Sequence, residues 1–254
     1  MFPKTGAMNH PQRNIVDEIS WISKNSFDFI DLTIEPTKAG QFDVAKAKKA
    51  LRDSGLGIIG HTTPFLPFAL PVSSIRHACM KEFTKYAKIF SRLEAEYVNI
   101  HPAYNMPFHS TDEKIEANIS FMSDFSKIAG KQGLTLIIEN FIEPFDIPQT
   151  FKRIFNRIPD ARMHLDAGHA NIMQGENQTR AFFKEFGKKI VHLHVSDNNG
   201  AEDEHLPLGC GNIDWSEIVG IMKKNKYNRT VTFEIFSNDR DYLLLSRDKF
   251  VSLF

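Results

Sequence analysis

The stretch from Lys189 to Trp215, KIVHLHVSDNNGAEDEHLPLGCGNIDW, decides how the rest of the chain is interpreted. In its first part, valine and leucine alternate with His192 and His194, and this period of two predicts a strand with one apolar face and one imidazole-bearing face. The strand leads into a polar loop that contains Asp203 and His205. Because borderline divalent cations take imidazole and carboxylate ligands together, the stretch predicts a metal site.

On both sides of this stretch, short runs rich in β-branched residues alternate with longer runs of helical period. Seven strands are expected, at residues 27–34, 57–62, 97–101, 134–140, 162–166, 190–195 and 231–236, and an eighth would have to lie in the weak opening stretch Phe2–Met8. Helical sequence follows the strands, for example at residues 43–53 and from Ser73 and Thr111 onward. This alternation, without a helix-only or strand-only block, predicts a parallel sheet.

Potential metal ligands fall at or near the carboxyl ends of the expected strands. Six of them share this placement: His61, His101, Glu139, Asp166, His194 and Glu234. In a (βα)₈ barrel these strand ends surround one mouth, where the active sites of that fold are built. An open sheet would bring fewer strand ends to one place. We therefore expect an α/β protein with one (βα)₈ barrel domain over residues 1–254.

These residues resemble the xylose isomerase-like TIM barrels, the group that contains sugar isomerases and epimerases together with endonuclease IV. The resemblance covers nearly the whole chain after the first strand. It rests on the segments IIEN, LDAGH, HLHVSD, DEHLPLGCGNIDW and FEIF. It implies a site for one divalent ion, as in the epimerases, formed by Glu139, Asp166, His194 and Glu234. The three-metal site of endonuclease IV adds donors that match His61, His101, His169, Asp203 and His205.

The resemblance implies one to three divalent ions (Zn, Mn or Fe), and two activities are compatible with them. One or two ions can polarise a carbonyl and an adjacent hydroxyl while a carboxylate moves a proton between neighbouring carbons. That is isomerase or epimerase chemistry on a small sugar, sugar phosphate or polyol, with Glu139 and Glu234 as catalytic residues. Three ions suit a multi-zinc phosphodiesterase similar to endonuclease IV, acting on apurinic-site DNA or a small phosphoester. If metal engages all nine donors, no carboxylate is left free as a base, which weakens the isomerase interpretation.

Charge favours a small carbohydrate-like substrate over nucleic acid. Lys+Arg and Asp+Glu are equal at 31 each, so no overall field attracts a polyanion. Phosphate contacts need Lys or Arg near the mouth. The segments PAYNMPFHS, NFIEPFD, AGHANIMQGEN and SDNNGAEDE, which follow four of the strands, contain neither.

Substrate contacts are expected from Asp31, Phe65, Phe68 and Asp197. Asp31 could instead support a ligand from behind or have a structural role. The TPFLPFALP loop, which contains both phenylalanines, could be a lid or a packing surface. His164 and His192 lie one layer deeper than the strand ends, and we expect them to be hydrogen-bonded core histidines rather than ligands.

The remaining expectations concern the environment of the protein. Cys79 and Cys210 are the only cysteines, which argues against a disulfide framework and favours a reducing cytoplasm. The opening MFPKTGAMNHPQR lacks the apolar run of a signal peptide, and no run of about 18 apolar residues predicts a membrane span. A homo-oligomer is compatible with the sequence.

Overall fold

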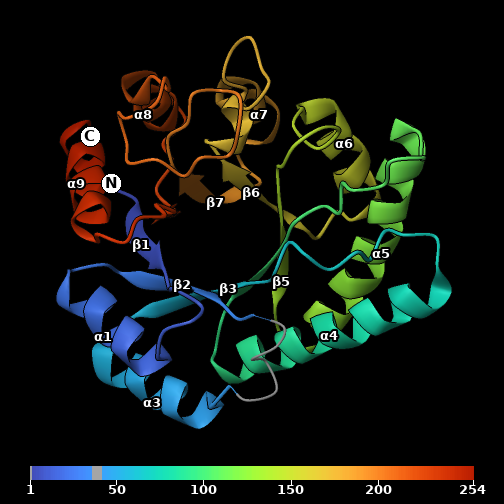
Figure 1. The fold of residues 1–254 in the computed structure, drawn as a ribbon, viewed down its shortest axis with the longest axis horizontal. Helices are drawn as coiled ribbons and strands as arrows, with labels where there is room; N and C mark the ends of the chain where they lie inside the picture. Colours follow the sequence, from blue (N-terminus) through green and yellow to red (C-terminus); the bar gives the residue numbers. More distant parts are fainter. Residues whose placement is uncertain (1, 36–41) are drawn as a thin grey trace.

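The computed structural model describes residues 2–35 and 42–254, and its strands form a closed parallel barrel in sequence order, β1 to β8, with β1 also paired to β8 (Figure 1). This confirms the expected (βα)₈ barrel, including the weak first strand. The strands are β1 (Lys4–Met8), β2 (Phe29–Thr33), β3 (Gly57–His61), β4 (Tyr97–Ile100), β5 (Thr135–Glu139), β6 (Arg162–Asp166), β7 (Ile190–Val195) and β8 (Thr230–Phe233).

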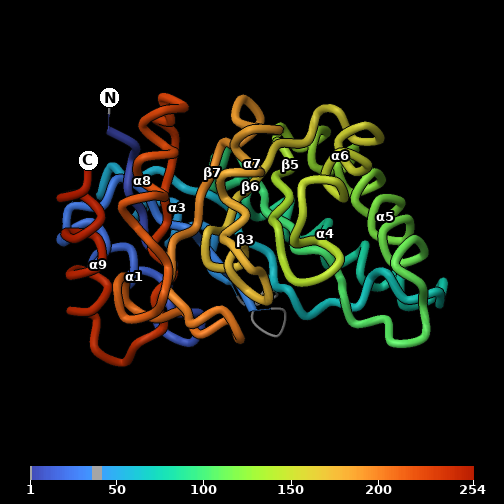
Figure 2. The backbone as a smooth tube through the Cα atoms, turned by 90° about the horizontal axis from the view of Figure 1, so that it is seen from above, coloured from blue at the N-terminus to red at the C-terminus, as the bar shows by residue number. Residues whose placement is uncertain are grey.

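Helices surround the barrel on its outer side (Figures 1 and 2). They are α1 (Ile15–Lys24), α3 (Val44–Ser54), α4 (Ser73–Arg92), α5 (Thr111–Lys131), α6 (Pro148–Arg157), α7 (Thr179–Phe186), α8 (Trp215–Lys224) and α9 (Asp241–Ser252), with the short 3-10 helix η1 (His169–Asn171) after β6. Local signals set several boundaries. Ser110 and Glu113 form a reciprocal capping box at the start of α5, and α3 ends at Gly55, whose φ of 71° is accessible to glycine without strain.

The apolar core lies mainly between the strands and the surrounding helices. A second, smaller apolar cluster lies inside the barrel toward the amino ends of the strands and contains Phe29, Ile59, Ile137 and Val191, with Tyr97 packed against it. We call this cluster the plug. It closes the barrel interior on the side opposite the mouth.

The layer of side chains above the plug is polar and completely buried, whereas the interior of this fold is usually filled by branched apolar residues. It contains Asp31, Asn99, His164, His192 and Thr232. Buried polar groups of this kind are tolerated when they hydrogen-bond one another. The mouth of the barrel therefore has a hydrogen-bonded polar floor, which we call the polar layer.

Only β6 and β7 have the expected bounds; the other strands are shorter, and in two of them the difference concerns a donor. β8 ends at Phe233 rather than at residue 236, and β4 ends at Ile100 rather than at residue 101. Glu234 and His101 thus follow their strands directly, and both side chains still face the mouth. Among the described residues, no helix combines the length and the apolar character needed to cross a membrane.

Candidate metal centre

The structure brings all nine predicted donors to the carboxyl ends of the strands. Four lie on strands: His61, Glu139 and Asp166 at the ends of β3, β5 and β6, and His194 one residue before the end of β7. His101 and Glu234 directly follow β4 and β8. The other three, His169, Asp203 and His205, lie on the segments that follow β6 and β7. Side chains alternate between the two faces of a strand, and the six donors at the strand ends all occupy positions that face the barrel interior. They therefore meet at a single mouth.

A four-donor group lies at the centre of this mouth and consists of Glu139, Asp166, His194 and Glu234. Its ligand atoms all lie within 4.8 Å of one another. Nδ1 of His194 is 2.8 Å from Glu234 Oε2 and 3.8 Å from both Glu139 Oε1 and Asp166 Oδ2. One imidazole nitrogen and three carboxylate oxygens therefore converge from four different strands.

The hydrogen bonding of this group fits a divalent cation. Glu139 Oε1 and Asp166 Oδ2 are buried and have no hydrogen-bond partner within residues 2–35 and 42–254. Burial raises the pKa of Asp166; His169 and His194 lower it in part, and the Glu139 and Glu234 charges raise it further. Clustered buried carboxylates are costly unless a positive charge offsets them. The nitrogen and oxygen donor set is one that Zn, Mn or Fe accepts.

Two further groups of donors adjoin the first. His61, His101 and Glu139 also have ligand atoms within 4.8 Å of one another, and His101 Nε2 lies 2.9 Å from Glu139 Oε2. On the loop side, Nε2 of His169 and Nε2 of His205 lie 3.1 and 3.0 Å from Asp203 Oδ2. Glu139 belongs to two groups, and His169 and His205 lie 3.6 and 3.8 Å from Asp166 Oδ2 and Glu234 Oε2, so the donors form one connected array.

In the metal-free protein, protonated imidazoles balance these carboxylates. Burial lowers the pKa of His205, but the Glu234 charge and the hydrogen bond to Asp203 raise it to about 9. The pKa of His194 is likewise raised well above its ordinary value despite burial, chiefly by Glu234 and by its hydrogen bond to Asp31. A bound cation would take the place of these protons.

Two residues of the polar layer hold Glu139 from below: His164, which was expected to be a hydrogen-bonded core histidine, and Asn99, for which no role was expected from the sequence. Asn99 donates from Nδ2 to Glu139 Oε2 at 2.7 Å, and His164 Nδ1 lies 3.1 Å from the same oxygen. Their contacts leave Oε1 as the oxygen that joins the four-donor group. The available signal was parity, because Asn99 precedes His101 by two residues and His164 precedes Asp166 by two.

Phe68 and Asp197, expected at the substrate, lie elsewhere. Phe68 is 2% exposed and stacks on Phe121 of α5 at 4.2 Å, so it belongs to the core and no substrate can reach it. Asp197 is fully buried and accepts hydrogen bonds from the backbone N–H groups of Gly209 and Ile213 and from the Trp215 indole. It fixes the shape of the loop that carries Asp203 and His205, and its position gives it no access to a substrate.

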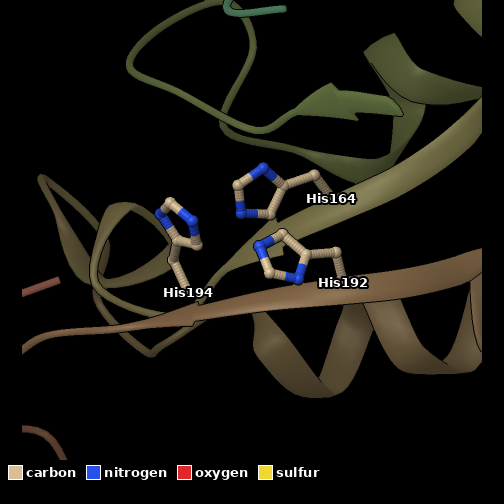
Figure 3. Close-up of side chains that lie close together, drawn as sticks. All are labelled: His164, His192 and His194. Carbon is tan, nitrogen blue, oxygen red and sulfur yellow. The ribbon is translucent and has the colours of Figure 1, made fainter. Parts of the chain in front are cut away.

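The two other expected substrate contacts differ in exposure. Phe65 is 77% exposed on the loop after β3, where a substrate contact stays a prediction. Asp31 is completely buried in the polar layer, between His192 and His194. His192 is hydrogen-bonded on both nitrogens, to Thr230 and to Asp31, in keeping with the core role expected for it. Figure 3 shows how closely His164, His192 and His194 lie to one another.

Aromatic rings that the sequence did not single out border the donors. Phe141 packs edge-on against His101 and His169, with ring centroids 5.6 and 4.8 Å apart. Phe236 lies over His205 at 4.1 Å and is 62% exposed. Such rings keep the imidazoles in place and offer apolar surface to the carbon skeleton of a ligand.

The sequence from residue 19 to residue 249 matches the family described as xylose isomerase-like TIM barrel. The chain belongs to this family, and its closed eight-stranded barrel is the fold that the family name states.

Individual relatives place the chain among proteins named as epimerases and proteins of unassigned function. An uncharacterised protein of Methanocaldococcus jannaschii is 30% identical over 152 residues, covering 56% of this chain and 51% of the relative. The L-ribulose 3-epimerase of a Methylomonas species is 30% identical over 81 residues, covering 32% of this chain and 26% of the enzyme. The chain thus spans about half the length, or less, of the curated relatives it matches. A solved structure of a D-tagatose 3-epimerase-like protein superposes with a TM-score of 0.85 at 23% identity, covering 98% of this chain and 96% of that one.

Proposed function

We propose that the protein is a divalent-metal-dependent epimerase that inverts the carbon next to the carbonyl of a small ketose. The observation that carries this proposal is the arrangement of Glu139 and Glu234 around the four-donor group. They come from the ends of β5 and β8, three strands apart in the closed barrel, so they reach a ligand at the centre from different sides. The likeness of part of the chain to a protein named as L-ribulose 3-epimerase supports the same chemistry.

The state of the two glutamates suits proton transfer. Burial raises the pKa of Glu139, but His101 and His164 hold it well below its usual range. Burial also raises the pKa of Glu234, and here His194 and His205 lower it. Both side chains are therefore ionised at neutral pH and able to act as a base. When bound, the ion would act as a Lewis acid toward the carbonyl oxygen and acidify the neighbouring C–H.

In the proposed reaction, the residues of the chain transfer protons and hold the reacting carboxylates in position. One glutamate removes the proton from the carbon beside the carbonyl. The other glutamate, after taking a proton from water, delivers it to the opposite face and so inverts that carbon, and proton exchange with water resets both carboxyl groups. Asn99 and His164 keep Glu139 Oε2 in place, so that this carboxylate does not turn away during the transfer. The aromatic rings of Phe141 and Phe236 pack against His169 and His205 and hold these imidazoles in place.

The experiment is proton exchange in heavy water. Protein loaded with Mn²⁺ or Zn²⁺ is incubated with D-tagatose and with L-ribulose in D₂O, and deuterium at C3 is followed by NMR alongside chromatography of the epimers. We expect deuterium at C3 and appearance of the C3 epimer. Absence of exchange with every ketose and metal tested would refute the proposal.

Hydrolysis of a phosphoester is the alternative, because His169, Asp203 and His205 supply donors beyond the four-donor group. The same metal-loaded protein is therefore incubated with a duplex that carries an abasic site, at low salt. We expect no cleavage, since the loops after β4 to β7 lack Lys and Arg in the segments that reach the mouth. Multiple-turnover nicking would favour the hydrolase.

A further inference from the structure

Asp31 occupies a central place in the polar layer directly beneath the metal ligands. It lies on β2 and is completely buried. Oδ2 is 2.7 Å from His194 Nε2 and 3.0 Å from His192 Nε2, and Oδ1 is 3.4 Å from His61 Nδ1. Asp31 thus hydrogen-bonds His192 and His194, and its Oδ1 lies near His61 without a hydrogen-bond partner among the described residues. The ligand atoms of Asp31, His61 and His194 also lie within 4.8 Å of one another.

The contact with His194 identifies the role of each ring nitrogen. Nδ1 of His194 faces Glu234, Glu139 and Asp166 in the four-donor group. Nε2 points the opposite way, at Asp31 Oδ2. A neutral imidazole carries one proton, so a proton held on Nε2 by Asp31 leaves the lone pair of Nδ1 free for an ion.

We propose that Asp31 is a positioning residue of the metal centre, which holds His194 by its inner nitrogen Nε2 and so presents Nδ1 of this ring to the four-donor group. This inference rests on the proposed metal dependence and does not depend on which sugar is the substrate. Carboxylates that hold metal-binding histidines in this way raise the basicity of the ligand and fix its ring. Because His194 belongs to the four-donor group, loss of Asp31 weakens the binding of an ion there.

Direct contact of Asp31 with a substrate is ruled out by its place below the ligands. The rings of His61 and His194 stack at 5.3 Å above it, and its exposure is 0%. The neighbouring His192 shares the same carboxylate and the same layer but has no atom in the four-donor group. It therefore offers a matched control within the barrel interior.

The test compares zinc affinity in Asp31→Asn and His192→Gln, measured by competition with a chromogenic chelator in the absence of sugar. The asparagine variant keeps an oxygen that can accept from the imidazoles but has lost the negative charge that makes His194 more basic, so we expect zinc binding to weaken by about 10- to 100-fold. The His192→Gln variant keeps an N–H donor for Asp31, and we expect it to bind zinc as the unmodified protein does. Thermal unfolding of each variant establishes that it is folded.

A purely structural role for Asp31 gives a different pattern. In that case Asp31→Asn lowers the unfolding temperature and leaves zinc affinity unchanged, or both variants lose affinity equally, and either result overturns the proposal. If Asp31→Asn does not fold, ¹⁵N-histidine NMR of the zinc-loaded unmodified protein decides. We expect a proton on Nε2 of His194 and zinc on Nδ1, with the signal assigned through His194→Gln, and the reverse tautomer overturns the proposal. Failure of the epimerase assay alone does not affect these outcomes.

Discussion

Addition of a divalent ion to metal-free protein is expected to raise its unfolding temperature by an amount that can be worked out. An ion that binds only the folded state at 100 times its dissociation constant stabilises that state by about 2.7 kcal/mol. For a chain of 254 residues, each kcal/mol moves the unfolding midpoint by about 2–4 °C. The expected rise is therefore about 5–11 °C, measured by calorimetry after chelation and again with Zn²⁺, Mn²⁺ or Fe²⁺ added.

The variant Asp166→Asn gives this prediction a specific signature. Because burial and the nearby Glu139 and Glu234 raise the pKa of Asp166, its ionisation destabilises the metal-free protein at neutral pH. The asparagine variant should then be more stable than the unmodified protein without metal, with the difference disappearing as the pH falls toward 3.8.

With metal present, the order of stability reverses. A loss of affinity of about 100-fold at the same ion concentration leaves about 0.4 kcal/mol of stabilisation, or a shift of about 1–2 °C. No shift of the unmodified protein with any of the three ions, or an equal shift in the variant, would contradict the assignment of the four-donor group.

Three further predictions concern single substitutions. Glu139→Gln and Glu234→Gln should each lower kcat by about 10²- to 10⁴-fold while thermal unfolding stays cooperative, since each removes a proton-transfer group and no part of the apolar core; turnover at the unmodified rate would place the chemistry elsewhere. Metal-free protein should lose stability as the pH rises from 6.5 through about 9. The reason is that burial lowers the pKa of His205 but Glu234 and Asp203 raise it to about 9 in the folded protein. The unfolding free energy of His205→Gln should therefore decline less over the same pH range. Gly60→Ala should cost about 1–3 kcal/mol in denaturant unfolding, because its Cβ would lie 2.4 Å from a buried phenylalanine ring of α4, whereas Gly130→Ala meets open space on α5 and should not destabilise.

The strands and the donors could be predicted from sequence because both depend on a local period. Alternation places His194 and Asp166 on the same face as residues two positions away, and parallel strands bring such faces to one mouth. The weak strand β1 has little signal of its own, since it is short and contains a glycine. Its pairing with β2 and β8 on both edges determines it, and that pairing is a property of the closed barrel.

The roles of loop residues could not be predicted, because they depend on which surface the loop packs against. Phe68 stacks between α4 and α5, whereas Phe65, three residues earlier, is exposed. Nothing in the pattern TPFLPFALP distinguishes the two. The partners of Asp31 were equally hidden, because its contacts with His192 and His194 join residues more than 160 positions apart.

The plug described above blocks one end of the barrel interior within residues 2–35 and 42–254. Because Phe29, Ile59, Ile137 and Val191 fill the interior at the amino ends of the strands, the proposed ion and sugar would both enter from the mouth. A sugar bound as proposed would lie between the ion and solvent and delay the escape of the ion. A chelator should therefore remove the ion faster from protein without substrate than from protein saturated with substrate. The concentration of the sugar would then also set the residence time of the ion.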